Sequence, residues 1–310
     1  MARSGKRRNS GRDVHGILLL DKPLGLSSNS ALQKAKRMFD ARKAGHTGSL
    51  DPLATGLLPI CFGQATKVSQ YLIDCDKQYR ATMQLGAVTT TGDTEGEVIQ
   101  EYDVSNVTST KISQVIRAFI GDITQVPPMY SAIKHQGKPL YKLAAKGVEV
   151  ERTPRKVHIF DLKLVDFRDN KVEFDVHCSK GTYIRTLAED MGKQLGCGAH
   201  LVSLRRYAVG NYQQITPYSF AQLNEILEQG GHESLDKQLL GLDSGLAHLP
   251  PLELNDEQAL RLSNGQRISV DSKLNPGLMR LYSPKSGFFG LGEEHASGLL
   301  SPSRIFHFSV

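Results

Sequence analysis

The order of strand-like and helix-like segments limits the fold of this chain more than any other feature of its sequence. Residues 79–86 alternate between apolar and polar side chains, which is typical of a strand, whereas residues 108–119 have helical periodicity. Two strand-like segments, 157–167 and 172–178, then follow as an apparent hairpin, and a helix is predicted at 182–195. Because regular strand–helix–strand alternation is missing, the order predicts an α+β fold.

Other segments are bounded by turn and capping residues. The stretch HGILLLDKP, residues 15–23, is predicted to be a short buried strand that ends at its proline. Residues 27–29 supply N-cap candidates for a helix that continues through Phe39. The remaining predicted elements are a Gly-rich loop at 45–56, a helix at 65–72 and a strand at 200–209. The sequence contains no internal repeat.

The composition of the chain changes at residues 249–251, Leu-Pro-Pro. Beyond this point the sequence predicts one short helix, 256–262, and several short strands separated by Gly and Pro turns. This pattern is typical of a small β-rich domain that folds as a separate unit. We therefore predict a basic tail at 1–13, a main domain at 14–250 and a second domain at 251–310.

The cysteine pattern bears on the compartment. The chain contains four cysteines: Cys61, Cys75, Cys178 and Cys197. No two form a C-x-x-C pair, which indicates reduced thiols in a cytosolic protein rather than a disulfide framework. A zinc site from Cys178, Cys197, His177 and His200 is a weaker alternative, because the paired short spacings of structural zinc sites are missing.

No segment is suited to a membrane or to export. The longest apolar runs, such as residues 16–20, are far too short to span a bilayer. The basic N-terminus is not followed by an apolar region of useful length, so no signal peptide is predicted. We therefore expect a cytoplasmic location.

Positive charge is concentrated in two blocks. Residues 1–45 carry 11 Lys and Arg against 3 Asp and Glu, a net charge of +8, while the whole chain carries +6. The second block, 134–156, holds seven Lys and Arg against two Glu. Such patches on a nearly neutral body suit a polyanion such as nucleic acid. A solvated tail and a solvated helix face would carry the same charges, so both interpretations stay open on charge alone.

Familiar catalytic motifs are absent from the sequence. It contains no phosphate-binding loop, no nucleophile elbow, no H-E-x-x-H and no G-x-G-x-x-G after a strand. The Gly-rich segment 45–56 offers a single carboxylate, Asp51, instead. Pro52 fixes its own backbone and restrains Asp51 toward extended conformations. Asp-Pro is also common in surface turns, so the residues alone allow either a catalytic carboxylate or a plain turn.

The segment GHTGSLDPLATGLLPI, residues 45–60, resembles the hallmark motif of the TruB family of tRNA pseudouridine-55 synthases. Four further stretches match the family in order: HGILLLDKPLGLSS (15–28), DKQYRATMQLG (76–86), CSKGTYIRTLAEDMG (178–192) and GCGAHLVSLRRYAVG (196–210). The resemblance runs from residue 14 to the C-terminus, and Ser49 lies at a position that the family varies. It implies a catalytic domain with a mixed, largely antiparallel sheet and flanking helices, followed by a PUA-like domain.

The resemblance also implies a reaction, the isomerisation of uridine to pseudouridine at position 55 in the T-arm of tRNA. The glycosidic bond is cleaved and the base is re-attached through carbon 5, a redox-neutral change that implies no cofactor and no metal. Asp51 is implied as the nucleophile, and whether it attacks the sugar or the base stays open. Arg185 is implied as the counter-charge that keeps Asp51 ionised, with a fork suited to bidentate pairing.

The resemblance assigns four further residues to the flipped base. Tyr79 is implied to stack on the uracil, and its hydroxyl to assist proton removal from carbon 5. Tyr183 and Leu204 are implied to contact the base, and His46 to border the space that the base leaves. Without the resemblance these residues would be interpreted as a half-buried strand tyrosine, a helix-start aromatic, a core leucine and a solvated histidine.

The basic block matches the insertion with which bacterial members grip the RNA arm, expected here at 124–153. Four lysines, Lys134, Lys138, Lys142 and Lys146, lie four residues apart. From Pro139 onward this spacing predicts that Lys142 and Lys146 share one helical face. We expect these lysines to contact the RNA backbone, which positions the RNA rather than specifying its sequence.

Two alternatives to a stand-alone tRNA-modifying enzyme follow from the same scaffold. One is a non-catalytic tRNA-binding or tRNA-folding protein, against which the presence of Asp51, Tyr79 and Arg185 together argues. The other is the guide-RNA-dependent branch of the superfamily, against which the basic insertion and the compact last domain argue. We predict a monomer that binds tRNA, needs no protein partner and does not bind a membrane.

Overall fold

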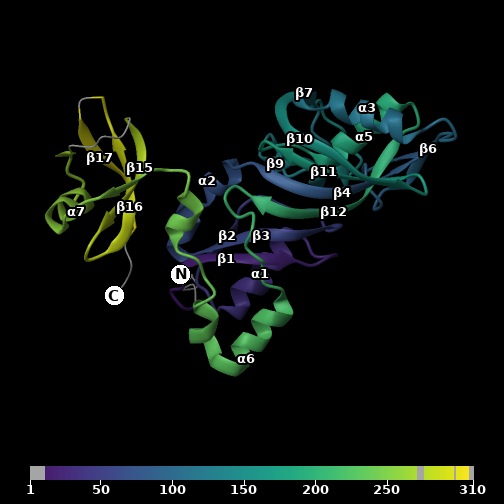
Figure 1. Ribbon diagram of the computed structural model, residues 1–310. Coiled ribbons are helices and arrows are strands. Elements are labelled where there is room, and N and C mark those ends of the chain that lie inside the picture. The colour runs from purple at the N-terminus through teal and green to yellow at the C-terminus, as the bar shows by residue number, and fades with distance from the viewer. Residues whose placement is uncertain (1–10, 271–275, 297, 307–310) are drawn as a thin grey trace, which may run out of the picture.

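Two large β-sheets organise the residues that the computed structural model describes, which are 11–270, 276–296 and 298–306. The sheets stand side by side in Figure 1, and helix α2 (Ser69–Asp74) lies on the side of the larger sheet that faces the smaller one. No helix within these ranges is both long and apolar enough to cross a membrane.

The larger sheet is mixed and largely antiparallel, which confirms the predicted fold class. Its strands run in the order β1 (Gly16–Lys22), β3 (Ala54–Phe62), β12 (Ala199–Val209), β4 (Lys77–Leu85), β11 (Lys171–Cys178), β10 (Arg155–Arg168) and β7 (Gly121–Gln125), with β2 (Ala44–His46) paired to β3. The pair β3–β12 is parallel and the other pairs are antiparallel. The predicted hairpin is formed by β10 and β11.

Helices cover one face of the larger sheet. They are α1 (Ser28–Met38), α3 (Ser109–Ala118), α5 (Ile184–Leu195) and α6 (Phe220–Asp236). The predicted N-cap of α1 is Ser27, whose side chain accepts a hydrogen bond from the backbone of Ser30. In β4 and β11 buried positions alternate with partly exposed ones, so these strands bury one face against the helices.

The edge formed by β1 and β3 is buried on both faces. Leu18 and Leu20 face the helices, whereas Ile17 and Leu19 pack with α2, the 3-10 turns η1 (Gly63–Lys67) and η2 (Leu242–Leu246). Burial on both sides explains why β1 is a continuous apolar run rather than an alternating one.

The smaller sheet begins where the composition of the chain changes. Its order is β13 (Pro251–Glu253), β15 (Gly277–Ser283), β16 (Gly287–Glu294), β17 (Leu299–Ile305) and β14 (Ile268–Ser269), with α7 (Asp256–Ser263) packed against it. This sheet with one helix agrees with the predicted PUA-like domain. Leu291 and Phe306 join the cluster that contains Val68 and Leu72, so the smaller sheet is packed against the α2 side of the larger one.

The sequence did not predict β3, the strand next to the Gly-rich segment. Gly56 has φ of 99°, and a Cβ there would lie 2.1 Å from the carbonyl oxygen of Arg206. Gly56 is therefore required inside a strand, because the backbone of Arg206 approaches it closely. In the sequence, such a glycine looks like a loop residue. The predicted loop 45–56 is shorter as a result, and the predicted helix at 65–72 is instead η1 followed by α2.

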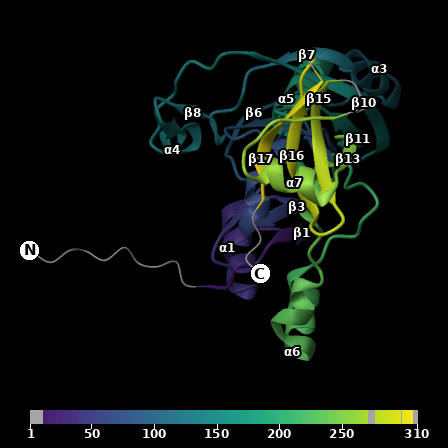
Figure 2. The ribbon, with the colours of Figure 1, turned by 90° about the vertical axis from the view of Figure 1, so that its left-hand side faces the viewer.

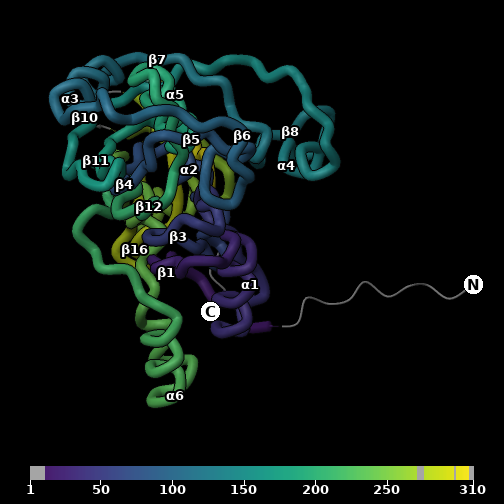
Figure 3. The backbone as a smooth tube through the Cα atoms, turned by 90° about the vertical axis from the view of Figure 1, so that its right-hand side faces the viewer, coloured from purple at the N-terminus to yellow at the C-terminus, as the bar shows by residue number. Residues whose placement is uncertain are grey.

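The segment between β7 and β10 is the predicted insertion, and it projects from the body of the molecule (Figures 2 and 3). It contains β8 (Lys134–His135), β9 (Lys138–Pro139) and α4 (Leu140–Ala144). The prediction that Lys142 and Lys146 share a helical face is wrong. The helix ends at Ala144 because Gly147 adopts φ of 71° and the chain turns back, with the N–H of Val148 donating to Leu143.

Most of the predicted basic tail, residues 1–10, lies outside the described residues. Arg12 was also assigned to that tail, but it belongs to the folded structure. Its guanidinium pairs with Asp236 of α6, and its backbone carbonyl accepts from the N–H of Arg42 at 2.9 Å. Two short strands that were not predicted, β5 (Ala87–Thr89) and β6 (Val98–Glu101), pair beside the sheet.

Candidate active site

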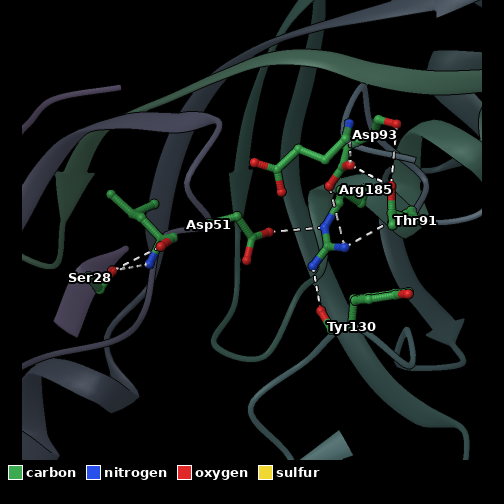
Figure 4. Close-up of polar contacts among 8 residues, drawn as sticks. Ser28, Asp51, Thr91, Asp93, Tyr130 and Arg185 are labelled. Atoms are coloured by element: carbon green, nitrogen blue, oxygen red, sulfur yellow. Dashed lines mark hydrogen bonds and ion pairs between the residues drawn. The ribbon is translucent and has the colours of Figure 1, made fainter. Parts of the chain in front are cut away.

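The Gly-rich loop between β2 and β3 carries Asp51 and is held on both sides of it. The buried hydroxyl of Ser28 donates to the carbonyl of Leu50 at 2.9 Å and lies 2.7 Å from the N–H of the same residue (Figure 4). On the other side, the N–H of Gly25 donates to the carbonyl of Pro52 at 2.8 Å. The loop is therefore fixed by contacts outside itself, and Asp51 is held in a defined position.

Asp51 forms an ion pair with Arg185 of α5, as the resemblance implied. Oδ2 of Asp51 lies 3.0 Å from Nε of Arg185. The arginine side chain is 5% exposed, whereas the aspartate side chain is 40% exposed. The pair thus consists of a buried cation and a carboxylate that remains accessible to a ligand.

The guanidinium does not present its two-nitrogen fork to Asp51, so the expected bidentate pairing is wrong. Nη1 donates to the carbonyl of Thr91 at 3.0 Å, and Nη2 donates to the carbonyl of Tyr130 at 2.6 Å (Figure 4). Nη1 also lies 3.5 Å from Oδ2 of Asp93. Four different groups therefore fix the arginine, and only Nε is directed at Asp51.

Asp93 is a site residue that sequence reasoning missed. Its side chain is 3% exposed, and its Oδ1 accepts hydrogen bonds from the hydroxyl of Thr91 at 2.5 Å and from the N–H of Glu95 at 3.0 Å. The signal that could have found it is the TTTGDTEG segment, a short polar stretch just after a strand that places two carboxylates, Asp93 and Glu95, between glycines. Arg185 is thus held between two carboxylates.

Two further buried cations lie behind the loop, and sequence reasoning missed both. Lys22 is fully buried, and its Nζ donates to the carbonyls of Pro23 and Leu26. Arg206 is 1% exposed; its Nε donates to Leu57 at 2.8 Å and its Nη2 to Gly48 at 3.3 Å, both backbone carbonyls. Arg206 therefore ties the loop that carries Asp51 to β3.

Burial and neighbouring charges shift the pKa values of Asp51 and Lys22. Burial raises the pKa of Asp51; Arg185 opposes this rise and Asp93 adds to it. Burial lowers the pKa of Lys22 to about 8, and the negative charge of Asp51 partly offsets that fall. The carboxylate of Asp51 is therefore less stabilised by its surroundings than one ion pair alone would suggest.

The residues expected at the base come from β4, from β12 and from the start of α5. Tyr79 of β4 is 8% exposed, pairs with Arg206 across the sheet, and has its pKa raised by burial, which Arg206 opposes. Leu204 of β12 is 8% exposed and belongs to the core cluster that also contains Tyr79. Tyr183 is the N-cap residue of α5, one residue before the helix that carries Arg185.

His46 lies at the end of β2, before the loop that carries Asp51. Its Nδ1 is buried without a hydrogen-bond partner. Burial lowers the pKa of His46, and the charge of Arg206 lowers it further. The ring is therefore neutral near pH 7 and has an unsatisfied nitrogen, which is unlike the solvated histidine of the plain interpretation.

The four lysines of the insertion are exposed and none is brought into the site. Lys134 and Lys138 flank the turn of the β8–β9 hairpin, Lys142 lies on α4, and Lys146 follows it. Within the described ranges, no three His, Cys, Asp or Glu side chains are grouped as a metal ion would require, so the alternative zinc site does not form there.

Comparisons with known proteins place this arrangement in a family. Residues 36–184 match the N-terminal domain of TruB family pseudouridylate synthases, residues 185–247 the C-terminal domain of tRNA pseudouridylate synthase B, and residues 250–306 a C-terminal domain of pseudouridine synthase II TruB. The tRNA pseudouridine synthase B of Actinobacillus succinogenes is 49% identical over 98% of this chain and 97% of its own length. That of Nitrosococcus oceani is 49% identical over 97% of both chains.

Solved structures share the fold. A Cbf5–Nop10–Gar1 complex contains a chain that matches 90% of this one, with 78% of its own length covered, a TM-score of 0.69 and 27% identity. A chain of an H/ACA RNP bound to a substrate RNA matches 98% of this one and 92% of its own length, with a TM-score of 0.73 and 23% identity, which supports the fold alone. With curated relatives near half identical along almost its entire length, the chain belongs to the TruB family of pseudouridylate synthases.

Proposed function

We propose that this protein isomerises uridine to pseudouridine in tRNA, at position 55 of the T-arm, with Asp51 as the nucleophile. The observation that carries the proposal is the accessible carboxylate of Asp51, 3.0 Å from the buried Nε of Arg185, in a chain whose relatives are named tRNA pseudouridine synthase B. In this reaction the bond from the sugar to N1 breaks and a bond from the sugar to carbon 5 forms. Carbon 5 loses a proton and N1 gains one, so no oxidant or reductant is needed.

The electrostatics of the site support a carboxylate that is ionised but reactive. Arg185 supplies the counter-charge that a buried carboxylate needs to stay ionised. Asp93 neutralises part of that charge and, together with burial, raises the pKa of Asp51. A carboxylate that is not over-stabilised keeps its nucleophilicity, which suits covalent catalysis.

The uracil is expected to lie between Tyr79 and the aliphatic and aromatic side chains of Leu204 and Tyr183. Stacking of a base on an aromatic ring is worth about 1–3 kcal/mol, and it tolerates the rotation that the base must make. We expect His46 to border the gap left in the RNA stack, a role that its neutral ring and its unpaired Nδ1 support.

The RNA is expected to be held by surfaces outside the site. We assign residues 14–250 to the catalytic domain, 251–310 to an RNA-binding domain, and Lys134, Lys138, Lys142 and Lys146 to backbone contacts with the T-arm. The solved structures that share the fold include a Cbf5–Nop10–Gar1 complex and an RNP bound to a substrate RNA. The basic insertion favours instead a chain that works as a monomer without a protein partner, and the cysteine pattern favours a cytoplasmic location.

One experiment tests the proposal as a whole. The purified chain is incubated with a single unmodified tRNA transcript, without other RNA or protein, and pseudouridine is mapped by chemical labelling and primer extension. We expect modification at position 55 alone. No product, or product only after a guide RNA or a partner protein is added, would contradict the stand-alone enzyme.

A further inference from the structure

Gln125 lies at the foot of the insertion, and its side chain is completely buried. It is the last residue of β7, and it pairs across the sheet with Arg155, the first residue of β10. The chain therefore leaves the sheet after Gln125 and returns to it at Arg155. Everything between these two partners, residues 126–154, projects as the insertion.

The Gln125 amide is bonded in both directions to the backbone of Tyr183. Its Nε2 donates to the carbonyl of Tyr183 at 3.2 Å, and its Oε1 accepts from the N–H of Tyr183 at 3.0 Å. Such a reciprocal pair fixes which end of the amide is oxygen and which is nitrogen. It also fixes the position of the Tyr183 peptide units, because both polar groups of that residue are engaged.

Tyr183 begins α5 without a capping side chain of its own. Its carbonyl accepts the first hydrogen bond of the helix, from the N–H of Leu187 at 3.0 Å, in addition to the bond from Gln125. Gln125 thus sets the starting point of the helix from outside it. Arg185 lies in the first turn of that helix, so a shift of Tyr183 would also shift the guanidinium that faces Asp51.

Two more contacts join the foot of the insertion to the same turn. The guanidinium of Arg155 lies over the ring of Tyr183, 5.5 Å from its centroid. The carbonyl of Tyr130, five residues into the insertion, accepts from Nη2 of Arg185 at 2.6 Å. The backbone of Tyr183, its ring and the side chain of Arg185 are therefore each held by residues at the base of the insertion.

We propose that Gln125 is a positioning residue for the isomerisation, which holds the first turn of α5 so that Arg185 meets Asp51 and Tyr183 faces the base. This inference rests on the proposed function, and it adds a residue that touches neither the RNA nor the reacting atoms. Any buried amide needs hydrogen-bond partners, and here both partners are the N–H and the carbonyl of Tyr183, the residue that starts the helix carrying Arg185.

The test compares Gln125→Met with Gln100→Met. The first substitution keeps the size of the side chain and removes both hydrogen bonds, while Gln100 is exposed on β6 and serves as the control. Single-turnover rates are measured at saturating tRNA, and tRNA affinity is measured separately. We expect Gln125→Met to slow the reaction by about 10- to 100-fold, the scale on which small misplacements of catalytic groups act, with affinity nearly unchanged. Gln100→Met should match the wild type.

Coupling to Arg185 separates positioning from a general loss of stability. If Gln125 acts through the first turn of α5, its removal should matter less once Arg185→Lys has already disrupted that contact, so the two losses in rate should combine to less than their product. Three results would each overturn the proposal. The first is a double variant whose loss of rate equals the product of the two single losses. The second is a Gln125→Met rate equal to that of the wild type, and the third is an equal loss of rate and of tRNA affinity in Gln125→Met. If Gln125→Met does not fold, Gln125→Asn, which keeps the amide but shortens its reach, is judged by the same three criteria. An inactive wild type would instead contradict the proposed function, whereas an active wild type with an equally active variant contradicts the positioning role alone.

Discussion

At the residue scale, the site places Asp51 under opposing influences on its pKa: burial and Asp93 raise it, and Arg185 lowers it. Burial raises the pKa of Asp51 even though Nε of Arg185 lies 3.0 Å from its carboxylate, and Asp93 forms a second ion pair with the same arginine. The motif around Asp51 and the presence of Arg185 could be predicted from the sequence by resemblance. The role of Asp93 could not, because Asp93 and Arg185 lie 92 positions apart in the sequence and the loop that carries Asp93 meets α5 only in the folded structure.

Replacing Asp51 by Asn should abolish isomerisation and leave tRNA binding nearly intact, because the amide has the same shape but is a poor nucleophile. The raised pKa also makes a prediction for stability. A carboxyl whose pKa is higher in the folded state contributes stability below its unfolded pKa and loses it as pH rises through the folded value. At pH 7 the Asn variant should therefore melt no lower than the wild type, and any gain should vanish at acid pH. Turnover by this variant would contradict the role of Asp51.

Arg185→Lys should lower the single-turnover rate by about 100-fold or more, the usual effect of removing a preorganised charged donor. A lysine carries its three donors on one nitrogen, whereas Asp51, Thr91 and Tyr130 are met by three different nitrogens of Arg185. We therefore expect at least one of these partners to lose its donor, and a buried carbonyl left without a donor costs about 1–3 kcal/mol. The variant should therefore also melt at a lower temperature. Arg80→Lys is the matched control, since Arg80 pairs with Asp175 on the exposed face of the sheet. If Arg80→Lys lowered the rate and the melting temperature as much as Arg185→Lys, the proposed role of Arg185 would be contradicted.

Asp93→Asn should change the pH dependence of the rate as well as its size. Asp93 raises the pKa of Asp51, so its neutralisation should lower that pKa and move the acid limb of the pH–rate profile to lower pH. The plateau rate should fall at the same time, because Arg185 loses one of the groups that orient it. Single-turnover rates between pH 4 and 8 measure both effects. An acid limb that stays in place or moves upward would show that Asp93 does not act on Asp51 through its charge.

At the scale of elements, patterns that depend on local contacts were predictable and those that depend on distant ones were not. The hairpin of β10 and β11 and the helices α1, α3 and α5 follow from alternation, periodicity and caps within each segment. The strand β3 was missed because Gly56 is needed for the approach of Arg206, a residue 150 positions later in the chain. The end of α4 was missed because the regular spacing of lysines outweighed the helix-ending signal of Gly147.

The corrected geometry of the insertion changes what its lysines should do. Since Lys142 and Lys146 do not share a helical face, they should contact different phosphates and act independently. Each phosphate contact contributes about −0.7 to −0.9 to the slope of log affinity against log salt. We therefore expect Lys142→Ala and Lys146→Ala each to flatten the slope by one such step, and the double variant by two. Lys163→Ala, at an exposed lysine paired with Asp161 on the sheet, should leave the slope unchanged; the same flattening there would mean that general charge, not the insertion, holds the RNA.

At the scale of the whole molecule, the two sheets are not joined by the chain alone. Phe306 is 3% exposed and lies in a cluster with residues of β1, β3 and α2 as well as Leu291 of β16. Its ring also lies 5.4 Å from that of Phe288 and 5.8 Å from Nζ of Lys67. The position of the C-terminal sheet could not be predicted from the sequence, because the apolar residues that form this contact look like ordinary core residues of their own strands. Their packing gives the C-terminal sheet a fixed place beside the larger one.

That fixed placement leads to a prediction about Phe306. Phe306→Ala should remove the ring that fills the contact, and loss of a buried phenylalanine usually destabilises by about 3–5 kcal/mol. Because the cluster lies between the two sheets, we expect the packing of the C-terminal sheet against the larger one to be lost before either core unfolds. Calorimetry should then show a separate transition at a lower temperature. We expect tRNA affinity to fall, because the two surfaces that we propose to bind RNA would no longer share one geometry. The single-turnover rate at saturating tRNA should be kept, because the described residues that pair with Asp51 or Arg185 lie outside this cluster. Leu260→Ala is the control, at a leucine of the same domain that is 62% exposed on α7. A loss of rate at saturation with unchanged affinity would show that the C-terminal sheet acts on the chemistry and not on the grip of the RNA.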